Sequence, residues 1–142
     1  MATRVLFVCT GNICRSAFAE EAARSLFDDS KFVFSSAGTH AISGAPATDT
    51  MVEAAAEIDV DVSSHSATPL RDCDQPDFVF GMEQHHLVAA RGQFPDLDVS
   101  RIRLLDHPSA IGDPYGFDLD TYRGTTSHIF TTLRATDLEA LR

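Results

Sequence analysis

The segment that most constrains the fold lies near the start of the chain, where a short apolar run meets a polar loop and then a helical pattern. Residues 5–8 are all apolar, residues 17–23 favour a helix, and the loop between them reads Cys9-Thr10-Gly11-Asn12-Ile13-Cys14-Arg15-Ser16. A continuous apolar run is typical of a buried parallel strand. Loop N–H groups and the positive end of the helix dipole would point to one place, so the sequence predicts an anion-binding site there.

The rest of the chain alternates between the same two patterns. Strands are predicted at residues 32–36, 77–81 and 101–105, helices at 16–27, 48–57, 83–91 and 119–141, and a connection with a short extended piece at 59–66. Strands separated by helices imply right-handed crossovers and a parallel sheet covered on both faces. We expect one α/β domain over residues 1–142, a three-layer sandwich with the anion-binding loop at the carboxyl end of the first strand.

Composition narrows the possible functions. A chain of 142 residues that is 44% hydrophobic can build one compact core. Its formal charge of −10 makes nucleic acid a poor partner. No stretch reaches the roughly 20 apolar residues of a membrane span, and the first residues lack the pattern of a signal peptide. We therefore expect a cytoplasmic protein without membrane insertion; export without a signal sequence and the oligomeric state stay open.

Cys9 and Arg15 give the loop its expected chemistry. The field that attracts an anion also favours a cysteine thiolate over the thiol. A planar guanidinium fits two oxygens of a phosphoryl group. An inert buried thiol is the alternative for Cys9, but a thiol and an arginine in one such loop favour a nucleophile that faces a bound oxyanion. Three cysteines, an odd number, do not form a disulfide framework.

Three motifs together resemble the low-molecular-weight protein tyrosine phosphatase family. They are the loop of residues 8–16, Ser36-Ala37-Gly38-Thr39, and Asp113-Pro114-Tyr115-Gly116. The resemblance covers nearly the whole chain, in motif order and in spacing. It implies a four-stranded parallel sheet with helices on both faces, which agrees with the periodicity described above.

The resemblance also implies a mechanism. Cys9 would attack phosphorus and form a cysteinyl-phosphate, while Arg15 and the loop amides hold the phosphoryl oxygens. Asp113 would protonate the leaving phenolate and then act as base for the attacking water. The substrate-binding residues would be Thr10, Gly11, Asn12, Ile13, Cys14, Ser16 and Tyr115. The implied partner is a phosphotyrosine-containing protein, with phosphate or another oxyanion in the site and no cofactor.

Other residues have supporting roles by the same resemblance. Asn12, Ser16, Ser36 and His65 would hold the loop, and the Ser16 hydroxyl would favour the thiolate of Cys9. Cys14 would form a reversible disulfide with Cys9 that protects it from over-oxidation, with plain packing as the alternative. Cys73 is expected to be a bystander. The histidines show no metal-ligand spacing, so no metal site is expected.

The sequence departs from the family pattern at two positions, and three alternative functions stay open. Gly116 stands where many family members carry a second aromatic residue, and Ile42 stands where some have an aromatic residue. An arsenate reductase that uses a thiol cofactor needs only one nucleophile. Arginine phosphatases of the family typically carry threonine at the position of Ile13, so Ile13 favours phosphotyrosine. A non-catalytic phosphate-binding module would need neither Cys9 nor Asp113.

Overall fold

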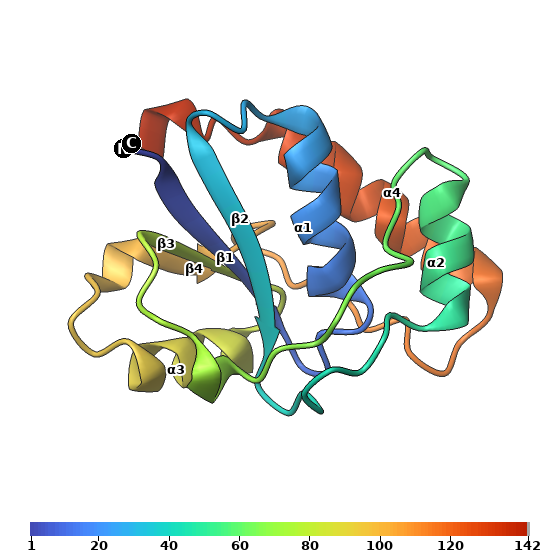
Figure 1. The fold of residues 1–142 in the computed structure, drawn as a ribbon, viewed down its shortest axis with the longest axis horizontal. Helices are drawn as coiled ribbons and strands as arrows, with labels where there is room; N and C mark the ends of the chain where they lie inside the picture. The colour runs from blue at the N-terminus through green and yellow to red at the C-terminus, as the bar shows by residue number, and fades with distance from the viewer. Residues whose placement is uncertain (142) are drawn as a thin grey trace.

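A four-stranded parallel sheet forms the centre of the computed structural model, which describes residues 1–141 (Figure 1). Its strands are β1 (Thr3–Cys9), β2 (Phe32–Gly38), β3 (Phe78–Gly81) and β4 (Ile102–Leu104). They lie in the order β2-β1-β3-β4, and every neighbouring pair is parallel. The predicted parallel sheet is therefore confirmed, and β1, which carries the loop, occupies an inner position.

Helices cover both faces of the sheet, as predicted. They are α1 (Arg15–Leu26), α2 (Asp49–Ala56), α3 (Gln84–Gln93) and α4 (Leu119–Ala135). Alternate side chains of β1 belong to two separate cores. Phe7 packs in the core shared with α1, α2 and α4, and Val8 packs in the core shared with α3. Figure 1 shows α3 on one side of the sheet and α1, α2 and α4 on the other.

Two details differ from the predictions. The last long helix ends at Ala135 instead of continuing to residue 141, because Thr136 is extended and Leu138 turns into the core, with 1% of its surface exposed. A short 3-10 turn, Glu139–Leu141, follows. Residues 59–66 contain no strand; Val60 and Val62 are buried in the core from a turn and loop that pair with no strand.

The topology brings the predicted site to the carboxyl edge of the sheet. Cys9, the last residue of β1, is level with Gly38, the last residue of β2, and Glu83 lies two residues after the end of β3. No helix within residues 1–141 is long and apolar enough to span a membrane. Two short 3-10 turns, Leu70–Asp72 and Val99–Arg101, lie in the connections before β3 and β4.

Candidate active site

The loop between β1 and α1 surrounds the thiol of Cys9. This side chain is buried, and its Sγ lies 2.9 Å from the hydroxyl of Ser16. The Ser16 hydroxyl accepts a hydrogen bond of 2.8 Å from the Asn12 side-chain amide. The hydroxyl hydrogen of Ser16 has two acceptors within reach, the Ala37 carbonyl at 3.4 Å and the Cys9 sulfur at 2.9 Å, and its donation to the sulfur favours the thiolate.

Asn12 stabilises the conformation of this loop. It has a φ of 56°, in the left-handed region that asparagine tolerates better than most residues. Its Nδ2 also donates to the Ser36 hydroxyl at 2.9 Å, and its Oδ1 accepts from the N–H of Thr68 at 2.9 Å. The backbone oxygen of Asn12 lies 2.6 Å from Nε2 of His65. The four residues predicted to support the loop are therefore brought together around it.

Glu20 extends this network and was missed by the sequence reasoning. The Ser36 hydroxyl donates to Glu20 at 2.5 Å, and Glu20 forms an ion pair of 2.7 Å with Arg24 one turn later on α1. The signal for it was present, because Glu20 follows Ser16 at the helical spacing of four residues. The buried loop thus connects through polar groups to the surface of α1.

Gly38 closes the back of the loop. The N–H groups of Thr39 and His40 donate to the carbonyls of Cys9 and Thr10, at 3.0 and 2.9 Å. A Cβ atom at Gly38 would lie 2.6 Å from the Thr10 carbonyl oxygen and 2.9 Å from the Asn12 nitrogen. These approaches are too close for a side chain, so only glycine lets β2 lie against the loop.

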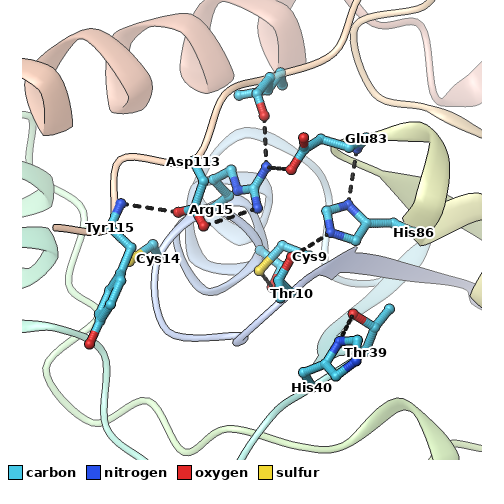
Figure 2. A network of polar contacts seen from close by, with 12 residues as sticks. Cys9, Thr10, Cys14, Arg15, Thr39, His40, Glu83, His86, Asp113 and Tyr115 are labelled. Carbon is cyan, nitrogen blue, oxygen red and sulfur yellow. Dashed lines mark hydrogen bonds and ion pairs between the residues drawn. The ribbon is translucent and has the colours of Figure 1, made fainter. Parts of the chain in front are cut away.

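Arg15 is held by hydrogen bonds at Nη1, while Nη2 faces the Asp113 carboxylate (Figure 2). With 1% of its surface exposed, it donates from Nη1 to Glu83 at 2.6 Å and to the Ile111 carbonyl at 2.8 Å. Its buried Nε has no hydrogen-bond acceptor within residues 1–141, and Nη2 lies 3.6 Å from the Asp113 carboxylate. A buried donor without an acceptor is costly, so the Nε and Nη2 edge is suited to a bound oxyanion.

Glu83 is the anion that fixes Arg15, and the sequence reasoning did not identify it. Burial raises the pKa of this carboxyl, but the hydrogen bond and charge of Arg15 outweigh burial and bring the pKa below its usual value. The position of Glu83 in the sequence could have indicated this role. An acidic residue just after a buried strand lies at the same sheet edge as the loop.

His86 links the loop to the start of α3. It is fully buried; its Nδ1 accepts from the N–H of Glu83 at 3.0 Å, and its Nε2 lies 2.9 Å from the Thr10 hydroxyl. Burial, followed by the charges of His85 and Arg15, lowers the pKa of His86 to about 3. The neutral ring is therefore the form present near neutral pH.

Glu83, His85 and His86 together offer ligand atoms within 4.8 Å of one another, a grouping that the sequence did not suggest. Both ring nitrogens of His86 already form hydrogen bonds, and Glu83 is paired with Arg15. The ligand atoms of Glu83 and His86 are thus already used to hold the loop, and only the exposed His85 makes no contact with it.

The predicted acid lies at the mouth of a cavity of about 210 Å³. The residues that line the cavity are Cys9, Thr10, Gly11, Ile13, Cys14, Arg15, Asp113 and Tyr115. The Asp113 side chain is about half exposed, and its Oδ1 accepts from the N–H of Tyr115 at 3.0 Å. Asn12 and Ser16, predicted to bind substrate, do not line the cavity; their side chains lie in the network behind the loop.

The two residues at which the sequence departs from the family pattern also lie off the cavity wall. Ile42 has 78% of its surface exposed. Gly116 has a φ of 85°, and no atom lies within 4 Å of where its Cβ would be. Tyr115 is thus the aromatic side chain that lines the cavity among the described residues.

The other two cysteines differ in their surroundings. Cys14 is buried at the start of α1, 3.5 Å from the hydroxyl of Tyr122 and 3.7 Å from that of Thr48, and burial raises the pKa of its thiol. Tyr122 had not been identified from the sequence. Cys73 is partly buried, and burial together with Asp72 and Asp74 raises the pKa of its thiol. All three cysteines are free thiols.

Comparison with known proteins agrees with this geometry. The family described as "Low molecular weight phosphotyrosine protein phosphatase" matches residues 4–140. The low molecular weight protein-tyrosine-phosphatase Wzb of Escherichia coli K12 is 31% identical over 127 residues, which cover 86% of this chain and 84% of Wzb. A protein-arginine-phosphatase of Bacillus subtilis is 29% identical, over 92% of this chain and 91% of the relative. The structure of Vibrio vulnificus Wzb in complex with benzylphosphonate superimposes with a TM-score of 0.84 at 28% identity, over 95% of this chain and 97% of that one.

Proposed function

Because this chain belongs to the low molecular weight phosphotyrosine protein phosphatase family, we propose that it hydrolyses phosphotyrosine in proteins through a cysteinyl-phosphate on Cys9. One observation carries this proposal. The Cys9 sulfur, the open edge of Arg15 and the Asp113 carboxyl border the same cavity. A nucleophile, an oxyanion clamp and an acid in one cavity are the groups that transfer of a phosphoryl group to a thiol requires.

In the first step, the Cys9 thiolate attacks phosphorus in line with the leaving oxygen. The P–S bond forms as the P–O bond to the phenol breaks, and Asp113 transfers its proton to the departing oxygen. Arg15 donates from Nε and Nη2 to the equatorial oxygens, because Glu83 and the Ile111 carbonyl occupy Nη1. The unpaired N–H groups at the start of α1 add further donors.

In the second step, water replaces the thiolate. The Asp113 carboxylate takes a proton from the water as the P–O bond forms and the P–S bond breaks. The Ser16 hydroxyl, 2.9 Å from Sγ, stabilises the departing thiolate by donating a hydrogen bond. Phosphate leaves, and Cys9 and Asp113 return to their starting protonation states.

The cavity wall favours an aromatic leaving group. Ile13 and Tyr115 line the cavity, and Tyr115 presents a ring on which a phenol can stack. The Vibrio vulnificus relative was solved with benzylphosphonate, a phosphonate that carries a phenyl ring. Phosphoarginine is the second candidate substrate, because a relative of similar coverage is a protein-arginine-phosphatase. A guanidinium gains less than a phenyl ring from contact with the apolar Ile13 side chain.

Parallel assays test the proposal. We expect the purified protein to hydrolyse a phosphotyrosine peptide faster than a phosphoarginine peptide, and not to reduce arsenate with glutathione. Cys9→Ser should remove the turnover while circular dichroism shows an unchanged fold. Faster release of phosphate from phosphoarginine would show that phosphoarginine, the second candidate, is the preferred substrate. Substantial turnover by Cys9→Ser would refute the cysteinyl-phosphate.

A further inference from the structure

We propose that the Thr10 hydroxyl is an additional donor to the bound phosphoryl group, oriented by the buried imidazole of His86. This inference rests on the proposed function, because it assigns a role in that same cavity. Two observations lead to it. Thr10 lines the cavity beside Cys9, and the fully buried His86 contacts Thr10 (Figure 2) from α3, on the opposite side of the sheet from α1 (Figure 1).

The hydrogen-bond pattern determines the tautomer of His86. The N–H of Glu83 can only donate, so Nδ1 of His86, 3.0 Å away, is the acceptor. A neutral imidazole that accepts at Nδ1 carries its hydrogen on Nε2. The ring is neutral because burial and nearby positive charge lower its pKa to about 3. His86 therefore donates from Nε2 to the Thr10 hydroxyl oxygen at 2.9 Å.

This donation determines what the Thr10 hydroxyl can do. Its oxygen accepts from His86, so its own hydrogen is left for another acceptor. Within residues 1–141 the Thr10 hydroxyl has no other hydrogen-bond partner, and the side chain borders the cavity. A phosphoryl oxygen in that cavity carries negative charge and accepts strongly. A threonine without His86 would be free to rotate and to accept from other donors, so the histidine fixes its role as a donor.

Glu83 connects the two side chains that would hold the oxyanion. Its carboxylate binds Nη1 of Arg15 at 2.6 Å, and its backbone N–H binds His86 at 3.0 Å. Arg15 and Thr10 are thus oriented from a single residue at the end of β3. Since both partners are positioned before substrate binds, the orientation costs little during the reaction.

Four substitutions test this role. Thr10→Val keeps the shape and removes the donor, and we expect phosphate to bind about 10-fold more weakly, with a similar loss in kcat/KM, the effect of one hydrogen bond to a charged group. Thr10→Ser should restore most of this loss. His86→Gln can place an amide N–H near the position of Nε2, whereas His86→Asn reaches only the position of Nδ1. We expect His86→Gln to bind phosphate more tightly than His86→Asn.

The measurement is calorimetric titration with inorganic phosphate, with thermal unfolding of each variant to confirm folding. This readout holds even if the substrate proves to be phosphoarginine, so it separates this inference from the proposed function. The double variant Thr10→Val with His86→Asn should bind phosphate as Thr10→Val alone does. Unchanged phosphate affinity in Thr10→Val, or additive losses in the double variant, would overturn the inference. Thr10→Val could instead shift the pH dependence of Cys9 alkylation by iodoacetate while phosphate affinity stays unchanged. That result would show that the Thr10 hydroxyl donates to the Cys9 sulfur, and it would also overturn the inference.

Discussion

Two segments that face the same cavity are built in opposite ways. The loop of residues 9–16 is largely buried, and hydrogen bonds connect it to β2, to α3 and to the segment around Thr68. The acid segment, residues 113–117, is mostly exposed, and it forms hydrogen bonds within itself, from Tyr115 to Asp113 and from Phe117 to Pro114. Phe117 has 66% of its surface exposed. The part that holds the phosphoryl group is thus fixed in advance, while the part that meets the leaving group can adjust to it.

After Cys9→Ser, the largest effect is expected from Arg15→Lys in the fixed loop. An ammonium has three N–H donors and lacks the planar fork of a guanidinium, so it cannot serve Glu83, the Ile111 carbonyl and two phosphoryl oxygens at once, and kcat/KM should fall by about 10³-fold. The measurement is turnover of a phosphotyrosine peptide, with Arg123→Lys on the exposed face of α4 as the matched control. Retention of a tenth or more of the activity would mean that the loop is not as rigid as its contacts indicate.

A smaller and substrate-dependent effect is expected from Asp113→Asn in the acid segment. Loss of general acid catalysis should slow phosphotyrosine hydrolysis by about 10²-fold. An aryl phosphate with a good leaving group needs little protonation and should lose much less. Asp120→Asn, an exposed carboxylate on α4, serves as the control. Equal losses on both substrates would show that Asp113 mainly positions Arg15, from which it lies 3.6 Å away.

The smallest effect is expected from Tyr115→Ala. Its ring is 61% exposed and can only contribute stacking to the substrate, so KM should rise about 3- to 10-fold with kcat nearly unchanged. Steady-state kinetics on a phosphotyrosine peptide measure both constants, and Phe117→Ala tests whether the neighbouring exposed ring contributes. A large fall in kcat would show that Tyr115 also holds Asp113 in place.

The same contrast explains what could be predicted from the sequence. The strands and the loop between Cys9 and Ser16 follow from periodicity and from a motif of adjacent residues, which are local properties of the chain. Glu83 and His86 could not be assigned to the loop, because they lie about 70 positions from it and meet it only when β3 pairs with β1. The end of α4 at Ala135 was missed for a similar reason, since it depends on where the core accepts Leu138.

Cys14 and Cys73 have different surroundings that composition alone does not predict. Both are free thiols in an acidic chain, but Cys14 lies in the buried loop beside Tyr122, and Cys73 lies outside the cavity. Whether Cys14 protects Cys9 by forming a disulfide stays a prediction. The burial that raises the pKa of Cys14 keeps it mainly as the thiol near neutral pH, which would slow its attack on an oxidised Cys9.

Gly38 has a consequence for how this site can change by mutation. It touches no substrate and carries no functional group, but any side chain there would collide with the Thr10 carbonyl and the Asn12 nitrogen. A genetic screen for loss of activity would identify substitutions of Gly38 as well as substitutions of Cys9 and Arg15. The phenotype alone would not distinguish this glycine from the two functional residues. Lineages that retain the loop are therefore held to glycine at this position, whereas the open space around Gly116 leaves that position constrained by its backbone angle alone.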